Sequence, residues 1–242
     1  MAQLFVSDLH LDAASPQAVE AFLGLLAGEA RGAQALYILG DLFESWIGDD
    51  DPDPVRSRVC AALRALAAGG VPIFALHGNR DFLLGPGFEA RSGCRLLPDP
   101  VITEIHGTRV LLTHGDLLCT GDAAYQELRS TVRGEPFRRR VAALSLAQRE
   151  LLASAARAGS RAHTSTVHAD IMDVDTGAIA ALVRATKVEC IVHGHTHRPA
   201  VHDSVLEGRP LRRIVLDAWY ESGGMLRWDA SGFEAVSLPF GA

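Results

Sequence analysis

The chain has 242 residues, a formal net charge of −6, 48% apolar residues and 21% charged residues. This length suits one full-sized domain with a modest insertion, and the composition excludes a largely disordered chain. The acidic balance argues against broad nucleic-acid binding through bulk charge.

The cysteines and the first residues bear on the cellular compartment. Cys60, Cys94, Cys119 and Cys190 are far apart and form no Cys-x-x-Cys pair, so we expect buried thiols rather than a zinc knuckle or a disulfide framework. The chain opens directly on a predicted strand, without signal-peptide features, and no charge-free run reaches the length of a membrane span. We therefore expect a reduced, cytoplasmic compartment, with attachment to a membrane surface left open.

The first hundred residues alternate predicted strands and helices. Strands are predicted at 3–7, 35–39 and 71–76, where short apolar runs end in polar loops. Helices are predicted at 16–30, with Ser15 as the N-cap, and at 54–68, ahead of the pair Gly69-Gly70. This alternation predicts right-handed crossovers and a parallel sheet layered by helices.

From Leu96 onward the predicted strands follow one another more closely. A hairpin is predicted at 101–105 and 109–113, then a helix at 177–185, a strand at 188–192 and a meander through 201–205, 211–215, 225–228 and 233–238. The sheet should therefore be mixed, and the fold class α/β. Residues 122–169 interrupt this pattern with helical, Arg-rich and Ala-rich sequence. We expect them to form a helical cap inserted into a core of residues 1–121 and 170–242.

Seven oxygen or imidazole side chains follow the predicted strands. They are Asp8, His10, Asp41, Asn79, His114, His195 and His197. Parallel strands bring their carboxyl ends to one edge of a sheet, so we expect these side chains to meet in one crevice. Because they include no thiol, they suit Mn²⁺, Fe²⁺ or Zn²⁺ in a site that is not purely structural. Seven ligands exceed the needs of one ion, and with Asp41 shared they divide into two sites about 3.5–4 Å apart.

The local spacing supports this metal-site hypothesis. In Asp8-Leu9-His10 and His195-Thr196-His197, alternate residues should point the same way on extended backbone. Glycines stand beside the ligands, where the chain must turn sharply and approach an ion closely; they are Gly40, Gly78, Gly115 and Gly194. Any one motif alone is more often a structural loop, but five in this order after apolar strands favour a metal site.

The motifs Asp-x-His, Gly-Asp, Gly-Asn-Arg-Asp, His-Gly-Asp and Gly-His-Thr-His, spread over residues 8–198, resemble those of the calcineurin-like metallophosphoesterases. Longer matching segments extend the resemblance nearly end to end; they are 7–11, 37–44, 46–51, 77–83 and 193–199. They look like the branch of the family that hydrolyses UDP-2,3-diacylglucosamine in lipid A biosynthesis. The fold implied is a four-layer sandwich of mixed β-sheets flanked by helices, with an inserted helical cap.

The resemblance also implies a reaction and a cofactor. Water would attack the phosphorus nearer uridine, giving UMP and 2,3-diacylglucosamine 1-phosphate, with two divalent ions, usually Mn²⁺. The first ion would be held by Asp8, His10, Asp41 and His197, and the second by Asp41, Asn79, His114 and His195. Catalytic roles are implied for Asp41, Asn79, Arg80, His114 and His195. The family implies peripheral attachment to the cytoplasmic side of the inner membrane, and we infer no nucleic acid and no obligate protein partner.

Arg80 stands where many metallophosphoesterases have a histidine that can act as a general acid. Arginine does not release a proton at working pH, but its planar fork binds phosphate oxygens and stabilises charge in phosphoryl transfer. Arg80 therefore suits a phosphate leaving group, which needs little protonation. The alternative is a surface ion pair between Arg80 and Asp81.

The predicted cap carries seven arginines among apolar residues: Arg133, Arg138, Arg139, Arg140, Arg149, Arg157 and Arg161. The pattern fits a surface for anionic headgroups and acyl chains, and it fits equally well an amphipathic helix pair with a solvated face. The resemblance favours the first and implies substrate contacts at Asn79, Arg80, Asp122, Ser160, Thr164 and His195. A familiar lysine contact aligns with Val167, and we expect Arg157, Arg161 or His168 to compensate.

Other polar residues have less specific interpretations. The run Asp49-Asp50-Asp51 with Asp53 favours a solvated loop over a calcium site, because the EF-hand spacing is absent. His77 and His193 are expected to support the site through hydrogen bonds rather than to bind metal.

Two other functions stay open. The first is a metallophosphoesterase for another pyrophosphate or phosphodiester, such as a dinucleoside polyphosphate, and the apolar cap argues against it. The second is a non-catalytic binding module on the same fold, and the complete set of seven ligands argues against that.

Overall fold

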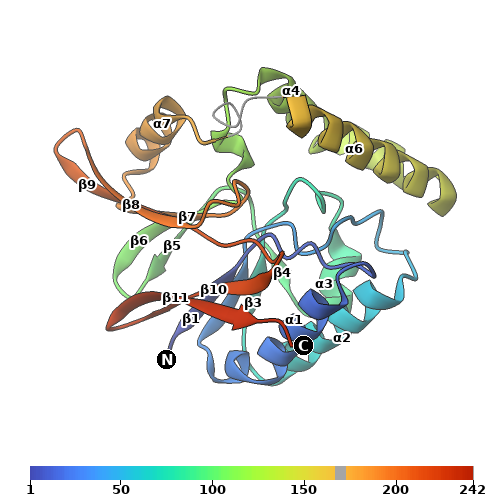
Figure 1. Cartoon of the computed structure of the whole chain (residues 1–242), viewed down its shortest axis with the longest axis horizontal. Coiled ribbons are helices and arrows are strands. Elements are labelled where there is room, and N and C mark those ends of the chain that lie inside the picture. Colours follow the sequence, from blue (N-terminus) through green and yellow to red (C-terminus); the bar gives the residue numbers. More distant parts are fainter. Residues whose placement is uncertain (167–172, 242) are drawn as a thin grey trace.

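The structure is a computed structural model that describes residues 1–166 and 173–241, with side chains described for 1–159 and 173–241. Two mixed β-sheets pack face to face, and helices cover their outer faces (Figure 1). The fold is therefore the predicted mixed α/β class. Among the described residues, no helix is both long and apolar enough to cross a bilayer.

The first sheet has six strands in the order β11-β10-β1-β2-β3-β4. Its strands are β1 (Gln3–Val6), β2 (Ala35–Ile38), β3 (Ile73–Ala75), β4 (Arg95–Leu96), β10 (Ser222–Asp229) and β11 (Gly232–Pro239). The first four run parallel, with Val6 beside Ile38 and Leu36 beside Ile73. β10 and β11 add to the free edge of β1 as antiparallel strands. The predicted parallel strands are confirmed, and the return of the C-terminal meander makes the sheet mixed.

The second sheet has five strands in the order β5-β6-β7-β9-β8. They are β5 (Val101–Ile105), β6 (Thr108–Leu112), β7 (Cys190–His193), β8 (Ala200–Leu206) and β9 (Arg209–Val215). The predicted hairpin is confirmed: β5 and β6 turn at His106 and Gly107, which both have positive φ as a two-residue hairpin turn requires. β6, β7 and β9 are parallel, so the ends of β6 and β7 point the same way.

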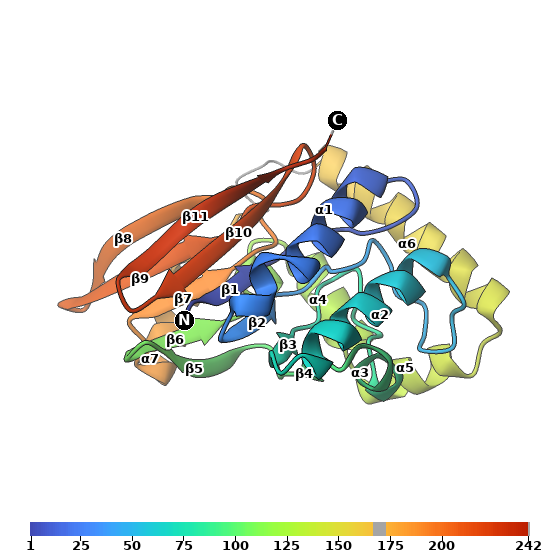
Figure 2. The ribbon, with the colours of Figure 1, turned by 90° about the horizontal axis from the view of Figure 1, so that it is seen from below.

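Helices on both sides complete four layers (Figure 2). α1 (Pro16–Ala27), α2 (Pro54–Ala68) and α3 (Pro86–Ser92) cover the outer face of the first sheet, and α7 (Thr176–Thr186) covers that of the second. Alternate residues of each strand serve different layers. Leu4 and Val6 pack on the helices, whereas Phe5 packs against the second sheet.

The starts of the helices show which local predictions hold. α2 begins as expected after Asp53, whose side chain accepts the Arg56 N–H at 2.9 Å. Ser15 is the N-cap residue of α1 as predicted, and its carbonyl accepts the Val19 N–H at 3.1 Å, but its hydroxyl makes no capping bond to the helix. It accepts the Asp12 N–H at 3.1 Å and donates to the carbonyl of His10 at 3.3 Å, so this residue organises the turn after β1 instead.

Three helices lie in the range proposed for the cap: α4 (Ala123–Val132), α5 (Glu135–Ala142) and α6 (Leu146–Thr166). They project from the end of the sandwich drawn at the upper right of Figure 1. α4 starts at Asp122, whose side chain accepts the Tyr125 N–H at 2.9 Å. α6 starts at a capping box, in which Gln148 accepts the Ser145 N–H at 3.0 Å and the Ser145 hydroxyl accepts the Gln148 N–H.

Candidate metal centre

The seven predicted ligands come together at the carboxyl ends of five strands. Asp8 and His10 follow β1, Asp41 follows β2, Asn79 follows β3, His114 follows β6, and His195 and His197 follow β7. The first three strands belong to one sheet and the other two to its partner. The centre is therefore built where the two sheets meet, and neither sheet supplies it alone.

Asp41 stands between two groups of imidazoles. Its Oδ2 lies 3.8 Å from His10 Nε2, and its Oδ1 lies 3.9 Å from His114 Nε2. The carboxylate is almost fully buried, and Oδ1 also accepts the Arg80 N–H at 2.8 Å. One oxygen of Asp41 thus faces each group, which is the arrangement that a shared ligand requires.

The first group surrounds Asp8. Its Oδ1 lies 3.3 Å from His197 Nε2, and its Oδ2 accepts the His195 N–H at 2.9 Å. Ligand atoms of Asp8, His10 and His197 all lie within 4.8 Å of one another, as do those of Asp8, Asp41 and His114. Asp8 is therefore common to both of these clusters, in addition to the bridging position of Asp41.

The second group surrounds Asn79. Its Oδ1 lies 2.9 Å from His114 Nε2 and 2.9 Å from His195 Nδ1. His114 Nδ1 is occupied at 2.9 Å by the carbonyl of Leu39, to which it donates. When His114 is neutral, its Nε2 lone pair therefore faces the amide oxygen of Asn79, and either a proton on Nε2 or a bound cation relieves that contact.

The donors fit divalent metal ions. His10 Nε2 is buried without a hydrogen-bond partner, while its Nδ1 is held by Glu44 Oε2 at 3.0 Å. His197 Nδ1 is likewise held at 3.0 Å, by the hydroxyl of Tyr220. Outer partners of this kind orient metal-binding histidines so that the other ring nitrogen is free to coordinate.

The backbone at the ligands differs from the prediction. Asp8, His10, Asp41, His195 and His197 have φ between 49° and 67°, so the expected extended backbone is wrong. The chain enters the left-handed region because it must turn back directly after each strand, and Asp and His tolerate that region better than most residues. The glycines beside the ligands leave room for carboxylates at Gly78 and Gly194, where a Cβ would overlap Asp41 and Asp8 respectively, and their close approach to an ion stays a prediction.

Burial and the clustered carboxylates set the charges of the imidazoles. Burial opposes the charged form of His114, but the negative charges of Asp41 and Asp8 outweigh it and raise its pKa to about 9. Burial, and then the charge of His114, lower the pKa of His195 to about 4. Without metal, the centre therefore attracts positive charge at His114 and keeps His195 neutral.

Arg80 does not pair with Asp81, so that alternative is wrong. The Asp81 carboxylate is fully buried and accepts the N–H groups of Leu42 at 2.8 Å and Gly78 at 2.7 Å. Arg80 instead places Nη1 3.9 Å from Glu44 Oε1, and its Nε is buried without a hydrogen-bond partner. Glu44 therefore links the guanidinium of Arg80 to the candidate ligand His10, because one of its oxygens lies near Arg80 and the other is hydrogen-bonded to His10.

Asp116 joins the centre to the cap, a role that the sequence reading missed. Its Oδ2 accepts from the Tyr125 hydroxyl at 2.9 Å, Arg129 Nε at 2.9 Å and Arg133 Nη2 at 2.8 Å. The ring of Tyr125 stacks on His195, with centroids 6.1 Å apart. The signals available were the position of Asp116 two residues after His114 and the spacing of the two arginines by one helical turn.

The other predicted contacts are placed only in part. Asp122 caps α4, and Arg157 on α6 pairs with Glu150 at 3.2 Å. Burial would raise the pKa of Glu44, but its hydrogen bond with His10 and the charges of Arg80, His10 and Arg157 lower it. The side chains of Ser160, Arg161, Thr164, Val167 and His168 lie outside the described residues.

The remaining histidine and cysteine predictions agree with the structure. His77 Nε2 donates to the carbonyl of Leu84 at 2.9 Å, and His193 Nδ1 donates to that of Gly194 at 2.8 Å. Both rings therefore hold loops of the centre. The four cysteines are free and buried.

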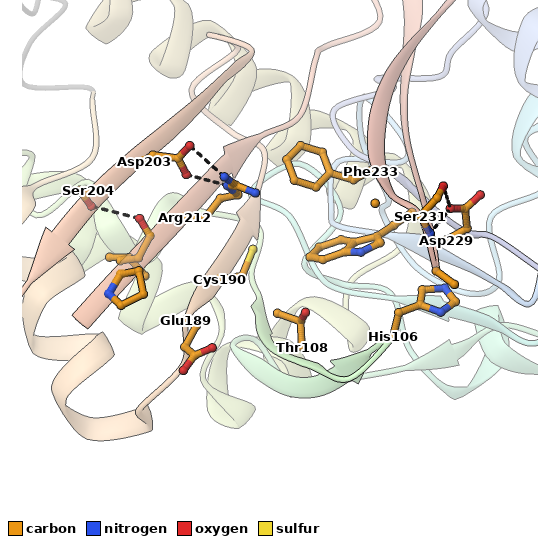
Figure 3. Close-up of a pocket in the computed structure, with 15 residues that line it drawn as sticks. His106, Thr108, Glu189, Cys190, Asp203, Ser204, Arg212, Asp229, Ser231 and Phe233 are labelled. Atoms are coloured by element: carbon orange, nitrogen blue, oxygen red, sulfur yellow. Dashed lines mark hydrogen bonds and ion pairs between the residues drawn. The ribbon is translucent and has the colours of Figure 1, made fainter.

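A cavity of about 830 Å³ lies away from this centre. It is lined by residues at the starts of β6 and β7 and at the turn between β10 and β11, whereas the ligands follow the ends of β6 and β7. Figure 3 shows Arg212 on its wall, paired with Asp203 at 2.6 and 2.9 Å. The guanidinium also lies over the ring of Phe233, 5.3 Å from its centroid.

Comparison with known proteins defines the class. The chain belongs to the calcineurin-like phosphoesterase family, whose model matches residues 1–199, and it is a hydrolase. It is 47% identical over 240 residues to UDP-2,3-diacylglucosamine hydrolase of Escherichia coli O17:K52:H18 (strain UMN026 / ExPEC), covering 99% of this chain and 100% of the relative. The protein of that name from Escherichia coli strain K12 is 46% identical with the same coverage.

Among solved structures, an archaeal phosphodiesterase matches with a TM-score of 0.49 and 12% identity, covering 98% of this chain and 100% of that one.

Proposed function

We propose that this chain hydrolyses the pyrophosphate bond of UDP-2,3-diacylglucosamine, releasing UMP and 2,3-diacylglucosamine 1-phosphate in lipid A biosynthesis. The observation that carries the proposal is the 47% identity to a hydrolase of that substrate over its whole length. The seven candidate metal ligands that converge at the edge of the two sheets support the chemistry.

We assign the metal ligands in two sets. Asp8, His10, Asp41 and His197 would hold one ion, and Asp41, Asn79, His114 and His195 the other, with Mn²⁺ as the expected metal. Bound divalent ions polarise phosphoryl oxygens and lower the pKa of water at such sites. The ligands are already turned inward by outer partners such as Glu44 and Tyr220, so little rearrangement accompanies binding.

Arg80 is assigned to the phosphate. Its guanidinium is within 3.9 Å of Glu44 and so stands beside the centre, where its planar donors can bind the pyrophosphate oxygens. Water attacks the phosphorus nearer uridine, and the sugar phosphate leaves. Because the second ionisation of a phosphomonoester lies near pH 6, that group departs with little protonation, and a permanently charged arginine stabilises it.

The cap is assigned to the rest of the substrate. We propose headgroup contacts from Asn79, Arg80, Asp122, Arg157, Ser160, Thr164 and His195. Exposed leucines on α4 and α6 would meet the acyl chains; they are Leu128, Leu151 and Leu152. With these surfaces the enzyme would act as a peripheral protein on the cytoplasmic side of the inner membrane.

The test is UMP release from UDP-2,3-diacylglucosamine in detergent with Mn²⁺. We expect Asp41→Ala to reduce the rate by more than about 10³-fold and Arg80→Ala by about 10²-fold or more, because both act on charge that develops in the transition state. Arg139→Ala is the matched control, since Arg139 is an exposed cap arginine, and it should keep the wild-type rate. Wild-type protein that cleaves a generic phosphodiester but leaves this substrate intact would refute the substrate assignment.

A further inference from the structure

The expectation of a solvated loop for the acidic run after Trp46 is wrong in part, because Asp51 is buried although the side chain of Asp50 is 62% exposed. Asp49 accepts the indole N–H of Trp46 at 3.1 Å and the Gly87 N–H at 2.7 Å. Asp51 pairs with Arg56, which also donates to Ser45. These two acids therefore fix the loop to α2 and α3, whereas Asp50 points to a partner in the cap.

That partner is Arg149, in the first turn of α6. Its Nη1 and Nη2 donate to the two oxygens of Asp50, each at 2.6 Å. Nη1 also donates to the carbonyl of Ile47 at 2.9 Å, and Nε donates to that of Leu144 at 3.1 Å. The guanidinium, only 6% exposed, thus joins the turn before α6 to the loop of the core through a bidentate pair.

Gly48 shows that the loop is shaped for this guanidinium. Its φ is +147°, and a Cβ at this position would overlap Arg149 Nη1 and lie 2.8 Å from Asp50 Oδ1. A side chain at residue 48 would therefore fill the space that Arg149 occupies. The loop therefore forms a binding site for one arginine side chain. It consists of the carbonyl of Ile47, the space left by Gly48 and the carboxylate of Asp50.

The loop reaches the metal centre at its other end. Glu44, one residue before Ser45, holds the candidate ligand His10, and Asp41 lies three residues earlier. On the cap side, Arg157 follows Arg149 by eight residues, which is about 12 Å along a helix. One continuous loop therefore carries a candidate bridging ligand and also anchors the helix that bears a proposed headgroup contact.

We propose that Asp50 and Arg149 are positioning residues, whose contact fixes the first turn of α6 to the loop that follows Asp41 and so sets where the helix receives the substrate. The identity of that substrate rests on the proposed function, but the anchoring of α6 does not. Neither residue is assigned to the metal or to the reacting phosphate, so their loss should affect substrate binding far more than the chemical step.

The experiment compares Asp50→Asn, Arg149→Ala and Arg149→Lys with wild type. Asp203→Asn is the matched control, because Asp203 and Arg212 form a similar bidentate pair far from the cap, on β8 and β9. We measure KM and kcat for UDP-2,3-diacylglucosamine, and hydrolysis of bis(4-nitrophenyl) phosphate with Mn²⁺. Hydrogen exchange over residues 146–159 then reports on α6 without reference to activity.

For Asp50→Asn and Arg149→Ala, we expect a KM for the lipid substrate raised about tenfold, kcat within about threefold of wild type, and an unchanged rate on the small diester. Exchange in α6 should become faster, and Arg149→Lys should recover part of the loss. Unchanged KM and exchange would overturn the proposal, as would equal losses on both substrates. If wild type spares the lipid substrate, the proposed function fails, while the exchange data still decide whether the pair anchors α6.

Discussion

The cap is attached to the core through two charged junctions that differ in depth. At the α4 junction, Arg129 and Arg133 meet Asp99 and Asp116, whose side chains are 2% and 0% exposed. At the α6 junction, the buried Arg149 meets Asp50, whose side chain is 62% exposed. In both places a carboxylate of the core pairs with an arginine of the cap. Of these two junctions, only the one at α4 has buried carboxylates.

This difference predicts different roles. Buried carboxylates must keep their partners, since an unpaired buried charge is far more costly than an unpaired exposed one. We therefore expect the region around His114 and His195 to fold only when the ion pairs of the α4 junction are intact. The α6 junction should cost less to break, because its acid stays in contact with water, and this suits a contact that positions α6 rather than one on which folding depends.

Replacing Arg133 with methionine should produce the largest effect. Arg133 donates to Asp116 and lies within 3.4 Å of Asp99, so its loss leaves buried carboxylates undercompensated. We expect the free energy of unfolding, measured in urea, to fall by about 3–5 kcal/mol. Arg138→Met is the control, because the hydrogen bond described for Arg138 goes to the carbonyl of Leu84 and not to a carboxylate. If Arg133→Met lowers the free energy of unfolding by less than about 1 kcal/mol, the buried-junction interpretation is contradicted.

Replacing Tyr125 with phenylalanine should have an intermediate effect. The change keeps the ring against His195 but removes the hydroxyl that donates to Asp116 at 2.9 Å. We expect the free energy of unfolding to fall by about 1–2 kcal/mol, because one of three donors to a buried carboxylate oxygen disappears. Thermal unfolding monitored by circular dichroism measures this change. An unchanged Tm would mean that Arg129 and Arg133 satisfy Asp116 without the tyrosine.

Replacing Arg139 with alanine should have the smallest effect. Arg139 and Glu135 form a helical pair at 2.9 Å, with side chains 76% and 64% exposed. Exposed pairs of this kind contribute about 0.3–0.5 kcal/mol, and salt screens them. Urea unfolding at low and high ionic strength should therefore give nearly the same stability as wild type, and a loss above about 1 kcal/mol would show that cap-surface charges resemble the junctions.

The strand ends were readable from the sequence because hydrophobic runs and polar motifs are local signals. β5 was predicted at its observed bounds, α2 likewise, and the seven ligands fall after strands that parallel pairing brings together. The separation into two sheets was beyond local reasoning, since it depends on which strands pair. The family resemblance, rather than periodicity, supplied that part.

The junctions were unreadable for a related reason. Asp50 and Arg149 are 99 residues apart in the sequence. The residues around each of them give no sign of which opposite charge it pairs with. The positive φ of the ligand residues was also missed, because a strand-end motif gives residue types and no dihedral angles. The Ser15 hydroxyl failed as a cap for a similar reason: its choice of Asp12 and His10 depends on the path of the chain after β1.

The left-handed backbone at five candidate ligands has a consequence for how this sequence tolerates change. Each such residue costs about 1 kcal/mol relative to a glycine, and together they cost roughly 5 kcal/mol, comparable with the net stability of many domains. Glycine at Asp8, His10, Asp41, His195 or His197 would relax the backbone while removing a donor. Selection for thermal stability alone would therefore favour the loss of these candidate ligands. A library designed to stabilise this enzyme should keep these five positions unchanged.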